Sequence, residues 1–264
     1  MICPIAQRWR ARRASYRPVG EPIVTRAHEV AAIPDDRTAK DFVVAHHYAA
    51  SYPAARFRFG LYRAAELVGV AVFSVPANPA VLSRFGDVDA AELGRFVLLD
   101  EVASNGESWF LARAFDLLRL DGVAGVVSFS DPVARTAVDG RVTMPGHIGT
   151  IYQATNATYL GRSKPETRRL LPDGTVFHGR AAAKIRRRDV GWRYAAALLE
   201  RHGASPLGDA DGAMWLRTWV PRLTRPLRHG GNHRYAFALD RRLRRGLEAD
   251  AQPYPKLSIA AGWS

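Results

Sequence analysis

The chain has 264 residues, of which 47% are hydrophobic and 24% are charged, so it can bury a full core. Its Gly and Pro contents are ordinary for a globular chain, and no apolar run approaches the roughly 20 residues that cross a bilayer. Residues 1–26 lack the apolar segment of a secretory signal, and the single Cys3 cannot form an internal disulfide. The sequence therefore predicts a cytoplasmic protein that does not span a membrane.

The net charge of +13 is distributed unevenly along the chain. Residues 1–26 carry six Arg against one Glu, and residues 162–264 carry 21 Lys and Arg against nine Asp and Glu. Residues 27–161, in contrast, carry 11 Lys and Arg against 15 Asp and Glu. A catalytic core between flanks that bind a polyanion is typical of this pattern. A genome that favours Arg everywhere is the alternative, although it would not leave the middle acidic.

The N-terminal half predicts an arm followed by a helix. Residues 1–26 show no periodicity and contain Pro18, Gly20 and Pro22, so we expect a basic arm. Asp35 and Asp36 suit a helix N-terminus, and a helix over 38–48 is expected to end near the His pair that follows.

The middle of the chain predicts strands around one long helix. Alternating and β-branched runs predict strands over 57–62 and 67–75, paired antiparallel. A strand over 93–99, an amphipathic helix over 104–120 and a buried strand over 123–130 then predict a right-handed crossover with parallel pairing.

Later elements complete the prediction. We expect a short helix over 148–154, a strand over 158–161, a helix over 191–202 and strands over 214–220 and 233–239. The predicted fold is α/β (α+β), with a mixed central sheet flanked by helices and a basic C-terminal extension.

Polar residues gather at the ends of the predicted strands in four short motifs. They are His46-His47-Tyr48, Glu92-Leu93-Gly94-Arg95, Ser128-Phe129-Ser130-Asp131 and Gly146-His147-Ile148-Gly149-Thr150-Ile151-Tyr152-Gln153-Ala154-Thr155-Asn156. In this order they resemble the Mom family of phage DNA-modification proteins, within the GNAT-like acyltransferase superfamily. The resemblance covers residues 40–162 well and 163–245 more loosely.

The resemblance implies an enzyme that converts the amine of adenine in DNA to an N6-carbamoylmethyl (methylcarbamoyl) form and so protects DNA from restriction. It implies double-stranded DNA as partner and, for a bacteriophage protein, the host cytoplasm as location. The expected organisation is a basic arm (1–26), a GNAT-like catalytic core (27–162) and a basic extension (163–264) that completes the fold and contacts DNA.

An acetyl-CoA or related acyl donor is the expected cofactor. By resemblance, the pantetheine arm would lie along the strand at Phe96, Val97 and Leu98. The pyrophosphate would meet the helix N-terminus at Asn105, Gly106 and Ser108, where amides and the helix dipole attract anions. Only Gly106 remains of the usual glycine-rich loop, and Ser104 with Glu107 could instead form a capping box that satisfies the same amides.

Ser128 and Asp131 stand where a buried parallel strand ends, which is the edge at which α/β sheets place ligands. We expect both to be catalytic. Asp131-Pro132 could equally open a turn.

His47 is expected to act in catalysis and, with Tyr48 and Asp131, to hold iron, because the family resemblance implies an iron-dependent enzyme and these are suitable iron ligands. Because His46, His47 and Tyr48 are consecutive, they cannot all face one site on a helix. One His together with Tyr48 is the most that helix geometry allows, unless the chain leaves the helix there. A packing role at a helix end is the alternative.

Tyr152 and Arg95 complete the predicted catalytic set. Tyr152 could donate a proton to a thiolate leaving group, or could belong to the core. Arg95 lies at the start of an apolar strand, where a buried arginine needs an acidic partner. It could contact the substrate, or it could instead form an ion pair with Asp131 or Glu92.

The basic clusters are predicted to contact DNA phosphates, while interleaved aromatics hold an unstacked, flipped base. They could instead be solvated faces. The residues are Arg168, Arg169, Arg186, Arg187, Arg188, Arg241, Arg242, Arg244 and Arg245.

Two other functions fit the same sequence. One is an ordinary N-acetyltransferase of a small amine or a protein lysine. The other is a non-catalytic DNA-binding protein on a degenerate acyltransferase fold, which needs only the basic flanks.

Overall fold

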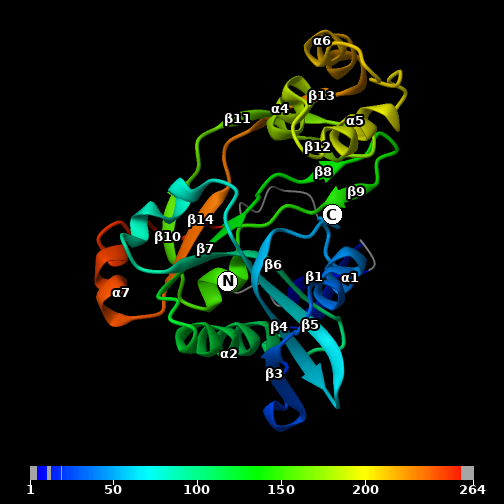
Figure 1. The fold of residues 1–264 in the computed structure, drawn as a ribbon. Helices are drawn as coiled ribbons and strands as arrows, with labels where there is room; N and C mark the ends of the chain where they lie inside the picture. Colours follow the sequence, from blue (N-terminus) through cyan, green and yellow to red (C-terminus); the bar gives the residue numbers. More distant parts are fainter. Residues whose placement is uncertain (1–4, 11–12, 19, 257–264) are drawn as a thin grey trace. The chain divides into compact units, whose positions relative to one another are not determined.

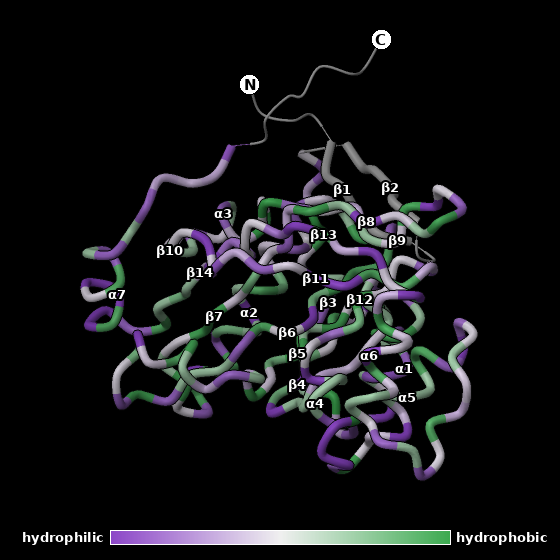
Figure 2. The backbone as a smooth tube through the Cα atoms, turned by 90° about the horizontal axis from the view of Figure 1, so that it is seen from above, coloured by the Kyte–Doolittle hydropathy of each residue, from purple (hydrophilic) through white to green (hydrophobic). Residues whose placement is uncertain are grey.

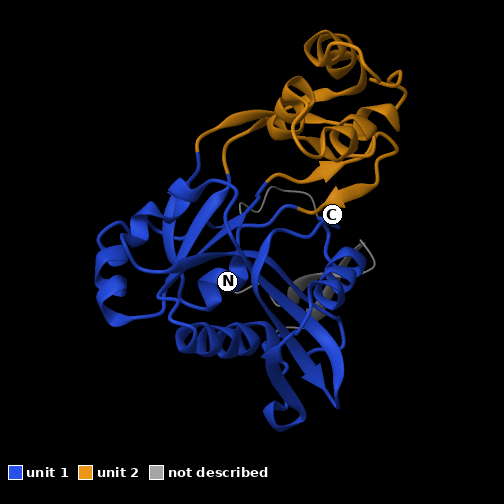
Figure 3. Cartoon of the chain, viewed as in Figure 1, with its two compact units in different colours: residues 1–132, 146–163, 232–264 blue, residues 133–145, 164–231 orange. Residues whose placement is uncertain are grey.

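The computed structural model describes residues 5–10, 13–18 and 20–256. Cys3, which supports the predicted compartment, lies outside these residues. The chain forms two compact units, shown in Figure 3: unit 1 contains residues 1–132, 146–163 and 232–264, and unit 2 contains residues 133–145 and 164–231. No helix in the described part of the chain is long and apolar enough to cross a membrane.

Unit 1 is built on a seven-stranded sheet in the order β10-β14-β7-β6-β5-β4-β3 (Figure 1). All neighbours in it are antiparallel except β6 and β7, which are parallel. The predicted mixed sheet is thus confirmed. The strands are β3 (His28–Ala32), β4 (Ala55–Arg63), β5 (Glu66–Ser74), β6 (Ala90–Leu98), β7 (Gly125–Ser130), β10 (Thr158–Arg162) and β14 (His233–Ala238).

The sheet splits between its two parallel strands. Residues 90–92 of β6 pair with residues 125–127 of β7, and the ladder goes no further. Beyond this point β6 stays paired with β5 as far as Leu98, and β7 stays paired with β14 as far as Ser130. The two strands therefore part towards their carboxyl ends, and this opening is called the split below.

A bulge in β6 lies at the start of the split. Val72 of β5 pairs with Arg95 and Phe73 pairs with Leu93, so Gly94 is the extra residue. A Cβ atom at Gly94 would lie 2.6 Å from Ser74 Oγ, so glycine is required by this close approach.

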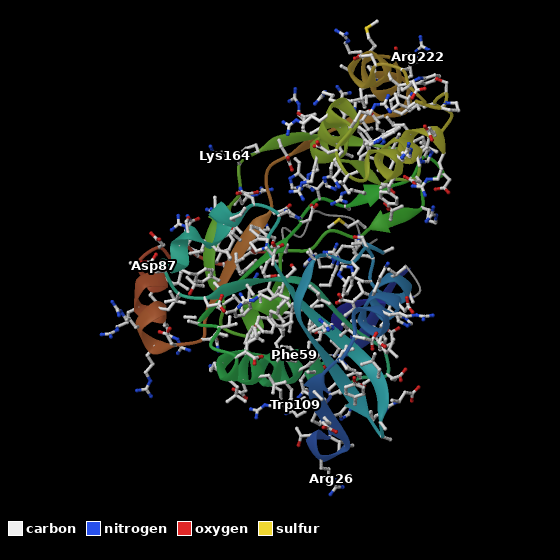
Figure 4. The ribbon with its side chains drawn as sticks, in the orientation of Figure 1. Arg26, Phe59, Asp87, Trp109, Lys164 and Arg222 are labelled. Atoms are coloured by element: carbon white, nitrogen blue, oxygen red, sulfur yellow. The ribbon has the colours of Figure 1, made fainter. Side chains whose placement is uncertain are left out.

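Helix α2 (Gly106–Leu120) covers one face of the sheet. Its Phe110 and Phe115 pack in one cluster with Phe73 of β5. Phe59 and Trp109, labelled in Figure 4, lie in or against this cluster. The short helix α3 (Thr150–Ala154) adds Tyr152 to the same cluster.

Two other helices cover the opposite face, because alternate residues of a strand point to opposite sides. Val43 of α1 (Asp36–His46) packs on Val70 and Val72. Leu247 of α7 (Arg241–Glu248) packs in a cluster with Ala236. In Figure 2, α7 alternates between purple and green, since four arginines and one glutamate share it with two leucines.

The start of α2 differs from the sequence prediction. The helix begins at Gly106 with Asn105 as N-cap residue, and no side chain caps it by a hydrogen bond. Asn105 Oδ1 instead accepts a hydrogen bond from the Ile23 N–H at 2.6 Å. The predicted Ser104–Glu107 capping box is therefore not formed.

Unit 2 has a small sheet in the order β12-β11-β13, a separate β8–β9 pair and a core of its own. Ile185, Leu199 and Trp215 are buried in that core. Its elements are β8 (Arg135–Thr136), β9 (Val142–Met144), β11 (Glu166–Leu170), β12 (Val176–Phe177), α4 (Gly179–Arg187), α5 (Trp192–Glu200), α6 (Gly212–Leu223) and β13 (Arg225–His229).

The strand predicted over 214–220 is wrong, because these residues lie in α6. The Asp211 side chain caps that helix by accepting a hydrogen bond from the Met214 N–H at 2.7 Å. Trp215 and Trp219, one helical turn apart, both pack on the unit 2 core.

The ends of the chain also differ from the expected organisation. Within the predicted arm, β1 (Ile5–Arg10) and β2 (Arg13–Pro18) form an antiparallel pair, and η1 (Thr25–Ala27) follows. Unit 2 includes residues 133–145, which lie within the predicted core, as well as 164–231, and residues 232–264 belong to unit 1, where β14 lies between β7 and β10. A further 3-10 segment, η2 (Pro79–Phe85), precedes β6.

Candidate active site

Ser128 connects the two sides of the split. It is fully buried in β7, and its Oγ donates a hydrogen bond to the Leu93 carbonyl of β6 at 3.3 Å. The Ser128 side chain also forms a hydrogen bond with Tyr152. The structure thus brings two predicted catalytic residues together at the point where the strands part.

Tyr152 is both a core residue and a site residue. Its ring lies 5.3 Å from that of Tyr235 and 6.2 Å from that of Phe237, and the residue is only 7% exposed. Burial raises the pKa of the phenol, whereas the hydrogen bond with Ser128 opposes this effect. The hydroxyl is therefore protonated at neutral pH and can act as a proton donor.

Arg95 is held by neutral oxygens. Its Nε and Nη2 donate to the carbonyl and Oγ of Ser51 at 2.8 and 2.7 Å, and its Nη1 donates to the Gly94 carbonyl. Burial lowers the pKa of Arg95, and its charge acts on Glu92, Tyr152 and His47. The guanidinium is thus a fixed positive charge among the predicted site residues.

Glu92, at the last position of β6 that pairs with β7, was not predicted as a catalytic residue. Burial raises its pKa, while the nearby Arg95 lowers it to a lesser extent. A carboxylate with a raised pKa is a stronger base, so Glu92 can accept a proton at the split.

The chain leaves helix α1 at His47, next to Tyr48. His47 has φ −87° and ψ 139°, and its ring lies 4.1 Å from that of Tyr48. Nδ1 of His47 accepts the Ala49 N–H at 3.1 Å, and burial, Arg95 and His147 lower its pKa to about 3. His47 is therefore a neutral imidazole at physiological pH.

His147 connects Tyr48 to Asp131, although the sequence analysis did not select it. Its backbone N–H donates to the Asp131 carbonyl at 2.8 Å, and its Nε2 lies 3.5 Å from the Tyr48 hydroxyl. Burial lowers the pKa of His147 to about 4, although the charge of Asp131 opposes the shift. Its position between two glycines in the 146–156 motif was the signal available.

The iron site predicted at His47, Tyr48 and Asp131 stays a prediction. Among the residues that the structure describes, no group of three or more His, Cys, Asp or Glu side chains is placed to hold a metal ion, although these residue types do not include Tyr48. The Arg95 charge that lowers the pKa of His47 also disfavours a cation beside that ring.

A second polar group lies across β7 and β14, where Ser130 pairs with His233. His233 Nδ1 lies 2.7 Å from the Tyr159 hydroxyl, while the buried Ser130 Oγ has no hydrogen-bond partner among the residues that the structure describes. The sequence analysis missed His233 because unit 2 lies between β7 and β14 in the sequence, so no local pattern shows that the two strands pair.

The predicted donor-binding residues lie in β6 and at the start of α2. Val97 and Leu98 are buried in β6, and the Phe96 ring lies 5.5 Å from that of Phe110. Ser108 Oγ donates to the Asn105 carbonyl at 2.9 Å. These positions match the expected strand and helix start, and their role in binding a donor stays a prediction.

The Mom protein family model matches residues 27–256. The chain belongs to the Mom family. A comparison with curated proteins found no match.

Solved structures with which this Mom-family chain shares partial similarity are GNAT proteins or related enzymes. A tandem GNAT protein from the clavulanic acid biosynthesis pathway, solved without AcCoA, is 13% identical over 55% of this chain and 48% of that one, with a TM-score of 0.36. The GNAT family N-acetyltransferase YhbS from Escherichia coli in complex with CoA is 12% identical over 53% and 72%, with a TM-score of 0.33. FeeM, an N-acyl amino acid synthase from uncultured soil microbes, is 15% identical over 45% and 86%, with a TM-score of 0.31.

The chain spans about half the length of the tandem GNAT protein. Likenesses this weak carry no argument about activity.

The arginines predicted to contact DNA divide into two groups. Arg188 donates to the carbonyls of Gly208 and Ala210 and stacks over Trp192 at 4.1 Å, and Arg168 pairs with Glu166 at 2.7 Å. These two stabilise unit 2. The others are exposed, and their contact with DNA stays a prediction: Arg169, Arg186 and Arg187 in unit 2, and Arg241, Arg242, Arg244 and Arg245 on α7.

Proposed function

We propose that the chain transfers a carbamoylmethyl-type group to the N6 amine of adenine in DNA, and that the reaction takes place at the split between β6 and β7. The observation that carries the proposal is the placement of Glu92, Arg95, Ser128 and Tyr152 around that split in a Mom-family chain.

The acceptor needs assistance from these residues. The lone pair of the adenine amine is delocalised into the ring, so it attacks only as its proton is removed. Glu92, with its raised pKa, is the proposed base. Catalytic residues cannot surround an adenine that is stacked inside a duplex. We therefore expect the base to flip out of the duplex before its amine reaches Glu92.

The donor is proposed to be a compound related to acyl-CoA that carries its leaving group on the methylene carbon that is transferred. The new nitrogen–carbon bond forms as the bond from that carbon to the leaving group breaks, and the amine proton passes to Glu92. Tyr152 gives its proton to the departing group, and Arg95 stabilises the negative charge that develops. The donor must carry its leaving group on the transferred methylene carbon, because attack at an ordinary acyl carbon would give an amide instead.

The test is a comparison of plasmid DNA from cells with and without the expressed chain. We expect a modified deoxyadenosine by mass spectrometry of the nucleosides, together with resistance to restriction endonucleases. Unmodified DNA with acetylated lysines or small amines would support an ordinary N-acetyltransferase. DNA binding with neither product would support the non-catalytic alternative, and either result would overturn the proposal.

A further inference from the structure

Unit 2 contains a cavity of about 660 Å³ that takes no part in the proposed reaction. Strands β11 and β12 and helices α4 and α6 line it, and all of its lining residues belong to unit 2. Its volume lies within the range of small-ligand sites, roughly 300–1,000 Å³.

Three arginines, Arg169, Arg186 and Arg217, supply positive charge to this cavity, and each is exposed. In the described part of the chain none of the three has a carboxylate within 4.0 Å, whereas the lining carboxylate of Glu166 is paired with Arg168. Unit 2 as a whole carries 16 Lys and Arg against seven Asp and Glu. The cavity therefore favours an anion.

The rest of the wall is mixed, with Thr167 and His178 as polar residues beside an apolar group. Phe177 and Leu216 are each 4% exposed, and Val220 lies beside them on α6. Inorganic phosphate would use only the arginines. An acidic peptide would match the charge, but it has no planar ring fixed beside its anion. A nucleotide has both the phosphate and the planar base.

We infer that this cavity binds one nucleotide of a nucleic-acid strand, with the phosphate on Arg169, Arg186 and Arg217 and the base against Phe177, Leu216 and Val220. The inference rests on the proposed function in one respect, namely that the strand is the DNA to be modified. The nucleotide held here is proposed to be a different one from the nucleotide that reacts, since none of the proposed catalytic residues lines the cavity.

The test measures binding of deoxyadenosine monophosphate, inorganic phosphate and a fluorescent single-stranded oligonucleotide to the full chain. The pocket variant is Arg169→Ala with Arg186→Ala. The control is Arg201→Ala with Arg228→Ala, which removes the same charge from exposed positions of unit 2 outside the cavity. We expect the pocket variant to lose at least about tenfold in affinity for the monophosphate and the control to stay within about twofold.

Three results would overturn the inference. The control variant could lose as much affinity as the pocket variant, which would indicate a general charge effect. Phosphate could bind as tightly as the monophosphate, which would exclude base recognition, or an acidic peptide could bind more tightly than either.

The variant Tyr152→Phe separates this inference from the proposed function. It should bind the monophosphate like the unmodified chain while failing to modify DNA. Modified DNA from the wild-type chain without nucleotide binding in unit 2 would overturn only the inference, and the reverse result would overturn only the proposed function.

Discussion

The hydroxyl of Tyr48 lies 3.5 Å from Nε2 of His147, although 99 residues separate the two in the chain. Tyr48 follows α1 on one face of the sheet, while His147 precedes α3, which packs on the other. The contact therefore brings together segments from both helical layers beside the split.

The two buried histidines predict acid sensitivity. The pKa of His147 falls from 6.5 to about 4 and that of His47 to about 3, so the unfolded chain binds protons that the folded chain does not between about pH 6.5 and pH 4. The free energy of unfolding should therefore decrease as the pH falls through this window. Above about pH 6.5 the two histidines should cause no such loss. Urea midpoints across that range measure the effect.

The variant His147→Gln is the check on this interpretation. It should flatten the pH dependence of the urea midpoint relative to the unmodified chain, because glutamine does not titrate. An equal slope in both proteins would mean that His147 is not the group responsible.

Tyr152→Phe should remove the proton donor and leave the ring in the core. We expect a loss of about 10²- to 10⁴-fold in modification rate. The unfolding free energy should change by only about 1 kcal/mol, for the lost hydrogen bond with Ser128. Single-turnover assays and urea unfolding give the two numbers, and an unchanged rate would remove Tyr152 from the reaction.

Arg95→Lys keeps a positive charge but loses the planar set of donors that hold Ser51 and Gly94. We expect the modification rate to fall by at least about tenfold, because the charge is no longer fixed among the site residues. Full activity in the lysine variant would show that charge alone is sufficient.

Gly94→Ala should disturb the bulge at the start of the split, because the added Cβ would lie 2.6 Å from Ser74 Oγ. A loss of about 1–3 kcal/mol in unfolding free energy is expected, with reduced activity. Gly246→Ala in α7 is the matched control, since nothing lies within 4 Å of its Cβ and alanine favours a helix. Equal destabilisation by both substitutions would contradict the role of the bulge.

Much of unit 1 was predictable because its signals are local. The period of apolar residues identified α2, the β-branched runs identified β5 and β7, and Asp35 marked the start of α1. Unit 2 was less predictable. Residues 214–220 were predicted as a strand, whereas the Asp211 cap and the packing of α6 on the unit 2 core favour a helix.

The candidate site was predictable only in part. Ser128 and Tyr152 were selected separately, from the end of a buried strand and from the following helix, and the structure places them side by side. The environments of Glu92 and His147 depend on burial and on Arg95 or Asp131, which no local pattern reveals.

The most direct test of the central claim is the amount of modified deoxyadenosine in DNA from cells that express the wild-type chain, Glu92→Gln or Tyr152→Phe at equal levels. The account predicts a modified nucleoside with the wild-type chain and almost none with either variant. Equal modification by all three would contradict the assignment of the reaction to the split, and its absence with a folded wild-type chain would contradict the proposed function itself.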